Sequence, residues 1–347
     1  MTHTPMCSSL KTDARKRPTL RQVAKAAGVS LMTASRAMRN QSNVLPAVAA
    51  RVRRAAEAAG YRPDPRVAAL MSHLRSRRKA TFTASIAAIT GITEQEETGQ
   101  ARLVREHARL RAEELGFRLE LFRVARPDVP DRRLERALIN RGIDGVLLLR
   151  MRAPVAVDRL LDWARFPVVS ATASVGAPAF ARVGPDYFSN ARVLCAKLAA
   201  AGRKRIGFVG TETYCARTND ALPAALAWHG ATVGAAALRP LVFARQQMDR
   251  AALRRWFARE RPDAIILYSQ EHVEAVSQEL GSRDADPVWI GCADVDPTQV
   301  VCSGINERPD LIGAKAIGLL AGMLHQNERG APAAPVNMRI EGVWVEA

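Results

Sequence analysis

The residues of this sequence best suited to a chemical task are its arginines and lysines, which gather near the N-terminus. Residues 1–80 contain 17 Lys or Arg against three acids, Asp13, Glu57 and Asp64, a net charge of +14. The other 267 residues share a net charge of +3. A basic segment joined to a nearly neutral remainder is typical of a protein that binds a polyanion. Nucleic acid is the first candidate and an anionic membrane surface the second.

Motifs for catalysis and metal binding are missing from the sequence. It has no GxxxxGK[ST] phosphate loop, no GxSxG nucleophile elbow and no HExxH zinc motif, and its six histidines are scattered. The five cysteines form no CxxC pair, so we expect reduced thiols rather than disulfides or a zinc site. We therefore predict a protein that is not an enzyme and that needs no metal and no cofactor.

Length and composition predict a globular chain with more than one domain. Of the 347 residues, 48% are hydrophobic, 24% charged and 5% aromatic, which excludes wholesale disorder. The sequence has no apolar run long enough to span a membrane and no N-terminal signal sequence. We expect a cytoplasmic protein without a membrane partner, associated with the nucleoid when it is bound to DNA.

Three short helices are predicted within the basic segment. Thr19-Leu20-Arg21-Gln22 has the form of a capping box, Gly28 is a helix stop and Ser30 can cap the helix that follows. The three residues between the first two helices are typical of a helix-turn-helix. The expected helices are 20–27, 31–39 and 46–59.

These residues resemble the DNA-binding headpiece of the lac repressor family. The resemblance rests on the three helices and on a Gly-Tyr-x-Pro exit, and the matching residues are 19–30, 33–37 and 58–63. It implies a sequence-specific transcriptional regulator whose second helix lies in the major groove of DNA.

The resemblance also implies which residues contact DNA. Leu31 and Met32, the first two residues of the second helix, would read bases, and apolar side chains suit thymine methyl groups. The alternative is that one of them packs on the third helix. Arg36 would bond guanine or, alternatively, a phosphate. The other expected contacts in the headpiece are Thr19, Leu20, Ser30, Thr33, Ser35, Asn43 and Tyr61, of which Thr19 and Ser30 can also cap helices.

Residues 64–80 are predicted to form a hinge helix and a linker. The hinge is too short to be a stable helix alone and should fold on DNA. In the family this helix pairs with its twin from a second subunit, and a leucine is wedged into the minor groove. Counting from Tyr61 places that leucine at Leu70, with Val67 beside it.

From residue 81 onward, apolar runs of strand length alternate with helical patterns. This order predicts two doubly wound lobes of parallel strands, with a ligand cleft at the carboxyl ends of the strands. The pattern resembles the periplasmic-binding-protein-like core of the same family. The first set has strands at 85–89, 118–124, 145–149, 167–170 and 181–183, with helices at 101–115, 131–141 and 157–163. The second set has strands at 205–209, 241–244, 264–268 and 288–291, with helices at 187–201, 217–229, 249–259, 273–280 and 311–326.

The resemblance implies an effector site between the lobes, for a sugar or a sugar acid. Arg217 matches the family's effector-binding arginine, which is expected at the start of a helix. Asp294 remains where many members have two carboxylates, and Glu307 stands where a glutamine is usual. Such departures put an ordinary sugar effector in doubt. The expected effector-binding residues are Thr90, Arg217, Ser269, Gln270, Asp294 and Glu307.

The sequence thus predicts an all-α helix-turn-helix headpiece with a hinge helix, followed by an α/β core of two parallel-sheet lobes. The expected boundaries are 1–18 for a flexible extension, 19–63 for the headpiece, 64–80 for the hinge and linker, and 81–347 for the core. The predicted function is a homodimeric repressor whose affinity for a pseudo-palindromic DNA operator is controlled by a small-molecule effector. The alternative is a constitutive DNA-binding regulator whose cleft no longer binds a ligand.

Overall fold

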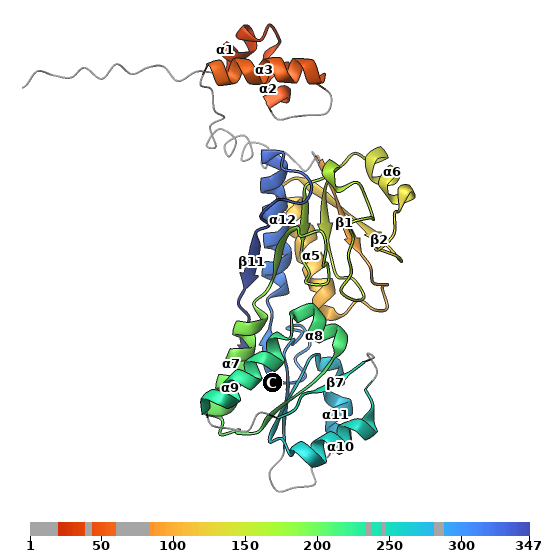
Figure 1. Ribbon diagram of the computed structural model, residues 1–347, viewed down its shortest axis with the longest axis vertical. Helices are drawn as coiled ribbons and strands as arrows, with labels where there is room; N and C mark the ends of the chain where they lie inside the picture. Colours follow the sequence, from red (N-terminus) through yellow and green to blue (C-terminus); the bar gives the residue numbers. More distant parts are fainter. Residues whose placement is uncertain (1–19, 39–43, 60–83, 234–237, 245–247, 281–287) are drawn as a thin grey trace, which may run out of the picture. The chain divides into compact units, whose positions relative to one another are not determined.

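The computed structural model describes residues 20–38, 44–59, 84–233, 238–244, 248–280 and 288–347 (Figure 1). The chain divides into two compact units, residues 1–75 and 76–347. The first contains the three helices of the headpiece, and the second, called the body here, contains two six-stranded sheets. No helix in these ranges is long and apolar enough to cross a membrane.

The headpiece is formed by α1 (Leu20–Ala26), α2 (Leu31–Met38) and α3 (Pro46–Ala58), close to the helices expected from the sequence. Their shared core is made almost entirely of alanine, whose small side chain lets the helices approach closely but buries little apolar area. Two valines add most of the remaining volume. The buried core residues are Val23, Ala24, Ala27, Ala34, Ala37, Ala49, Val52 and Ala56.

The turn between α1 and α2 is held by local hydrogen bonds. Gly28 has φ of 61°, the left-handed conformation that glycine adopts without strain. The Ser30 hydroxyl accepts a hydrogen bond from the Thr33 amide at 3.0 Å, so the predicted cap of the second helix is formed. From α3, Nε of Arg51 donates to the carbonyl of Ala27 at 2.9 Å and thereby satisfies the end of α1.

The first sheet of the body is fully parallel, with strand order β11-β5-β4-β3-β1-β2. Helices α5 (Gly99–Glu114) and α12 (Pro309–Gln326) cover one face, and α6 (Arg132–Asn140) with the 3-10 turn η1 (Trp163–Arg165) covers the other. The strands are β1 (Ala84–Thr90), β2 (Phe117–Arg123), β3 (Ile143–Leu148), β4 (Val168–Ser170), β5 (Ala181–Pro185) and β11 (Asn337–Ile340).

The second sheet has strand order β12-β10-β9-β8-β6-β7 and is parallel except for β12, which runs antiparallel to β10. One face carries α7 (Tyr187–Ala200), α8 (Glu212–Thr218) and α9 (Ala221–Val233), and the other carries α10 (Arg250–Glu260) and α11 (Val273–Leu280). The strands are β6 (Ile206–Thr211), β7 (Leu241–Phe243), β8 (Ala264–Leu267), β9 (Trp289–Cys292), β10 (Gly304–Asn306) and β12 (Val343–Val345).

The chain passes between the two sheets three times, from β5 to α7, from β10 to α12 and from β11 to β12. Figure 1 shows α12 lying along α5 and β11 in the first lobe. The prediction that residues 311–326 belong with the second lobe is therefore wrong. An amphipathic pattern specifies that one face is buried but not which sheet buries it.

Two further helix predictions are corrected by the structure. Residues 157–163 form no α-helix: residues 158–160 form a turn, and the 3-10 turn η1 begins at Trp163, whose indole donates to the carbonyl of Val157 at 2.7 Å. The predicted helix 217–229 is two helices, because Asn219 and Asp220 both have positive φ, 52° and 54°, and end α8. The short strands β10, β11 and β12 were not predicted at all.

Candidate DNA-binding surface and ligand site

The predicted base-reading residues fall on α2. Leu31 and Met32 are its first two residues, and Ser35 and Arg36 follow on the same helix. At its start, the hydroxyls of Ser30 and Thr33 lie 2.8 Å apart. Leu20 begins α1. The remaining predicted DNA contacts, together with segments 1–18 and 64–80, lie outside the described residues: Thr19, Asn43, Tyr61, Val67 and Leu70.

In the body, the first lobe contributes an arginine directly after β3. The Arg150 guanidinium is largely shielded from water and donates to the hydroxyl of Thr98, the N-cap of α5, at 3.3 Å. Burial, reinforced by the positive charge of Arg217, lowers the pKa of Arg150 to about 10. The hydroxyl of Thr90, a buried residue at the end of β1, donates to the carbonyl of Arg150 at 2.7 Å. Thr90 thus holds the arginine's backbone in place.

The second lobe contributes another arginine and two acids. Arg217 lies in the last turn of α8, not at the start of a helix as expected, and its guanidinium stands 5.5 Å from the ring centre of Tyr214. Asp294 follows β9 and Glu307 follows β10. The Oδ1 atom of Asp294 is buried and has no hydrogen-bond partner.

These four side chains, Arg150, Arg217, Asp294 and Glu307, form one electrostatic group, which we call the charged cluster. Burial raises the pKa of Asp294 to about 6, although both arginines oppose the rise. Burial also raises the pKa of Glu307 well above its ordinary value, and the charge of Asp294 adds to the effect. Each residue changes the protonation of its neighbours, so three of the predicted effector residues have been brought together.

The other predicted effector residues have different neighbours. Gln270 accepts a hydrogen bond from the amide of Asp296 at 2.9 Å and donates to the carbonyl of Gln299 at 3.1 Å. Its side chain therefore secures the loop after Asp294. Ser269 precedes the 3-10 turn η2 (Gln270–His272), and its side chain does not cap that turn.

Two residues of the site were missed by sequence reasoning. Arg150 follows the buried run 146–149, at the carboxyl end of a predicted strand, where ligands of such sheets bind. Its position after a predicted strand could therefore have identified Arg150 as a candidate from the sequence. Tyr187 is the first residue of α7, and burial followed by the charge of Glu307 raises the pKa of its hydroxyl. Asp186 before it caps α7 through the Ser189 amide at 3.1 Å, as expected.

The two lobes contact each other beside the charged cluster. Nε2 of Gln100, in the first turn of α5, donates to the carbonyl of Val295 at 2.9 Å. A Cβ atom on Gly99 would lie 1.7 Å from Oδ2 of Asp296, so a larger residue there would displace the Asp296 side chain. The start of α5 is thus closed against the loop that follows β9.

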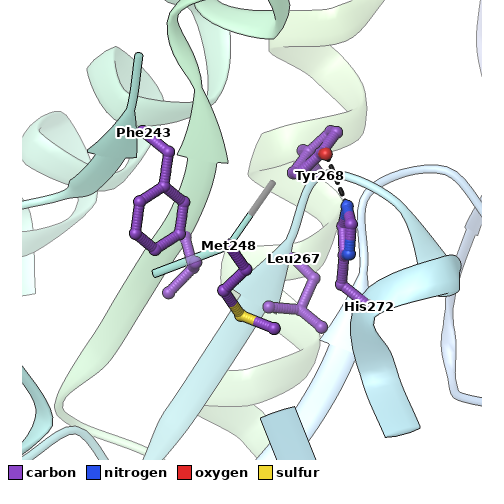
Figure 2. Close-up of a pocket in the computed structure, with 6 residues that line it drawn as sticks. Phe243, Met248, Leu267, Tyr268 and His272 are labelled. Carbon is purple, nitrogen blue, oxygen red and sulfur yellow. Dashed lines mark hydrogen bonds between the residues drawn. The ribbon is translucent and has the colours of Figure 1, made fainter. Parts of the chain in front are cut away.

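A small, mostly apolar crevice lies near the carboxyl ends of β7 and β8 of the second sheet (Figure 2). The Tyr268 hydroxyl and Nε2 of His272 form a hydrogen bond of 2.5 Å along one side. The ring of Tyr268 is 5.7 Å from that of Tyr214, which connects the crevice to Arg217. Its lining residues are Val209, Phe243, Met248, Leu267, Tyr268 and His272. The described residues contain no cluster of three or more His, Cys, Asp or Glu suited to a metal.

A helix-turn-helix headpiece followed by a two-lobed parallel α/β body defines the class of protein: a DNA-binding domain joined to a periplasmic-binding-protein-like core. Solved structures share this fold. One is a transcriptional regulator CelR–cellobiose complex, with a TM-score of 0.56 and 19% identity, covering 95% of this chain and 98% of that one. Another is the lac repressor bound to ONPG, with a TM-score of 0.55 and 16% identity, covering 95% and 99%.

The sequence comparisons find similar proteins of the same class. Residues 19–64 match the sequence model of the bacterial regulatory proteins of the lacI family. The transcriptional regulator GntR of Pseudomonas aeruginosa is 31% identical over 196 residues, 56% of this chain and 54% of the relative. The regulator CelR of Thermobifida fusca is 30% identical over 200 residues, 56% of each chain. The chain thus spans about half the length of the curated relatives it matches.

The resemblance inferred from the sequence is therefore confirmed for residues 19–64, which are similar to the DNA-binding domain of the lacI family. Its relatives are transcriptional regulators and not enzymes, in agreement with the prediction from the sequence.

Proposed function

We propose that this chain is a repressor that binds operator DNA as a homodimer and whose affinity for DNA is set by a small molecule between the lobes. The observation that carries this proposal is the lacI-type helix-turn-helix at residues 19–64, within a segment of net charge +14. Positive charge supplies affinity for the phosphate backbone, and the recognition helix supplies the sequence preference.

In this proposal α2 lies in the major groove. Leu31 and Met32 contact base edges, and Arg36 bonds guanine or a phosphate. Residues 64–80 form the hinge, and Leu70, with Val67 beside it, opens a base step in the minor groove. The phosphate and sugar contacts come from Thr19, Leu20, Ser30, Thr33, Ser35, Asn43 and Tyr61.

The position of the charged cluster supports control by a ligand. Glu307 lies in the crossing from β10 to α12, and Tyr187 lies just after the crossing from β5. A third crossing is tied to the first, because the amide of Gly342 donates to the Asn190 side chain at 2.8 Å. A ligand that contacts Glu307 and Tyr187 therefore touches the segments that must bend when the lobes move. Such a ligand changes the balance between lobe arrangements and, through it, the affinity for DNA.

The solved complexes of structural relatives contain cellobiose and ONPG, which supports a sugar or sugar-acid effector. The alternative is a constitutive DNA-binding regulator. It is favoured by Thr90 and Gln270, whose polar groups bind the protein's own backbone. A ligand that changes operator affinity excludes this alternative.

The experiment that tests the function is selection of duplex DNA from a random pool by the purified full-length protein at physiological salt. We expect enrichment of a pseudo-palindrome with half-sites about one helical turn apart and a deformable central step. The Leu70→Ala variant should then lose affinity and bending, while Leu110→Ala, at an exposed leucine of α5, should change neither. Binding without any sequence preference contradicts the proposal.

A further inference from the structure

Two cysteines of the second lobe lie next to each other. Cys292 is the last residue of β9, and Cys302 lies two residues before β10. Both are buried, and with Val295 they form a small apolar cluster on which Val273 and Val345 pack. Their thiols are hydrogen-bonded to each other. The two residues are therefore a pair of reduced thiols in direct contact.

The backbone holds this pair together. The Cys292 amide donates to the carbonyl of Ser303 at 3.1 Å, and Cys292 is in register with Gly304 of the parallel strand β10. A Cβ atom on Gly304 would overlap the carbonyl oxygen of Cys292, so the two strands approach each other closely here. A disulfide forms only between cysteines whose backbones are held at such short range.

The other two cysteines that the structure describes have different surroundings. Cys195 lies on α7 and Cys215 on α8, and burial raises the pKa of each thiol to about 11. A thiol with so high a pKa is almost wholly protonated and reacts slowly with oxidants. The hydrogen bond with Cys292 instead lowers the pKa of Cys302. Of these four thiols, Cys302 is thus the best suited to be oxidised first.

The segment that precedes Cys302 is open to solvent. Residues 297–301 are all exposed, and Val300 and Val301 are 39% and 58% exposed. Cys302 itself is only 5% exposed. A molecule as small as hydrogen peroxide therefore suits this thiol better than a bulky oxidant does.

The segment between the two cysteines, residues 293–301, also touches the first lobe, and we call it the contact loop. The carbonyl of Val295 accepts the hydrogen bond from Gln100 of α5 at 2.9 Å. The Cys292 sulfur donates to the carbonyl of Asp294 at 3.1 Å and accepts from its amide at 3.2 Å. A disulfide removes this S–H donor and draws the two sulfurs together to about 2.05 Å. Both ends of the contact loop, and Val295 between them, must then shift.

We propose that Cys292 and Cys302 are a redox pair that hydrogen peroxide converts into a disulfide, and that the disulfide changes operator affinity by moving the contact loop. The Cys302 thiolate attacks one oxygen of the peroxide, so the O–O bond breaks, a sulfenic acid forms and hydroxide leaves. The Cys292 thiol then attacks the sulfenic sulfur, and the S–O bond breaks with loss of water. The hydroxide takes up the proton that Cys302 lost, so two thiols are oxidised and the peroxide is reduced to water. The effect on DNA rests on the proposed function, whereas the chemistry of the pair does not.

Peptide mapping tests the chemistry on the full-length protein without any variant. No Lys or Arg lies between Arg283 and Arg308, and Pro309 blocks cleavage after Arg308, so trypsin leaves both cysteines in one peptide. After peroxide treatment and alkylation, we expect this peptide to have lost two hydrogen atoms in mass and to carry no alkyl group. Dithiothreitol should restore both alkylation sites. Alkylation of both cysteines after treatment, or a stable sulfinic acid on Cys302, overturns the proposal.

Operator affinity tests the consequence, with the DNA obtained by the selection described above. Peroxide should change the affinity of the unmodified protein by about threefold or more, and dithiothreitol should reverse the change. Cys302→Ala and Cys292→Ala should bind the operator equally well with and without peroxide. The matched control is Cys195→Ala, which removes another buried cysteine of the same lobe and should respond to peroxide as the unmodified protein does.

The results separate this inference from the proposed function. A peroxide effect that persists in Cys302→Ala overturns the inference, because it comes from another residue, such as a methionine. A disulfide that forms without changing operator affinity overturns the control of DNA binding by the pair. If the untreated protein selects no operator, the proposed function fails and with it the effect on DNA, while the peptide map still decides whether the pair is oxidised.

Discussion

Replacing Asp294 with asparagine should stabilise the body of the protein at neutral pH. The change removes a carboxylate that burial makes unfavourable, as its pKa of about 6 against an ordinary 3.8 indicates. The folded protein binds a proton on Asp294 more tightly than the unfolded chain does. The protonated carboxyl therefore contributes its full stabilisation below about pH 3.8, and this contribution is lost as the pH rises through about 6. Asparagine keeps the shape of the protonated acid without its titration.

The size of the effect follows from the two pKa values. Ionised Asp294 lowers the free energy of unfolding by about 3 kcal/mol, compared with an aspartate whose pKa does not change on folding. About half of this penalty develops between pH 5 and pH 7.5. The difference in the free energy of unfolding between Asp294→Asn and the unmodified protein should therefore grow by roughly 1 to 2 kcal/mol over that interval.

The assay is urea unfolding followed by tryptophan fluorescence at both pH values. All five tryptophans lie in the body, at positions 163, 228, 256, 289 and 344, so the headpiece does not contribute to the signal. The control is Asp158→Asn, which replaces an exposed aspartate and should shift stability equally at both pH values. A variant that is no more stable than the unmodified protein at pH 7.5, or whose advantage shrinks as the pH rises, refutes the reasoning.

Two further predictions concern packing. Gly313→Ala should destabilise the body by about 1–3 kcal/mol in urea, because its Cβ would lie 2.2 Å from the carbonyl oxygen of Val104 in α5. On the same helix Gly318 faces open space, so Gly318→Ala should stabilise by up to about 1 kcal/mol, and equal effects at both glycines would contradict this packing. Val52→Ala should lower the stability of the headpiece by about 1–2 kcal/mol and weaken operator binding, while the tryptophan signal of the body stays unchanged. A shift in the urea midpoint of the tryptophan signal would contradict this prediction, because it would show that Val52→Ala also changes the stability of the body.

The headpiece was predictable because its signals are local. Gly28 and Ser30 specify a helix stop and a helix start within three residues, and the structure uses both as expected. The partners of α12 were not predictable in this way. Its buried face carries the same periodicity whichever sheet it covers, and the close contact at Gly313 becomes visible only once α5 lies beside it.

The candidate ligand site was likewise predictable only in part. Arg217 and Asp294 were found through the family resemblance, which transfers positions without their surroundings. The Gln270 side chain forms hydrogen bonds with the backbone of the loop that contains Asp296. These bonds depend on the conformation of the loop, which no residue pattern specifies. Arg150 follows a strand predicted from the sequence, but its role depends on its neighbours: the guanidinium is largely shielded from water, lies near the charge of Arg217 and donates to the Thr98 hydroxyl.

The three crossings also constrain the order in which a growing polypeptide can complete its lobes. The first sheet lacks β11, and its face lacks α12, until residues 309–340 have been synthesised. The second sheet lacks β12 until residue 345 has been added. Neither lobe can finish folding on the ribosome before the other is nearly translated. A stop codon or frameshift before residue 337 therefore removes both β11 and β12 and leaves both lobes with an unpaired edge, and such a loss should expose the nascent protein to proteolysis as a whole.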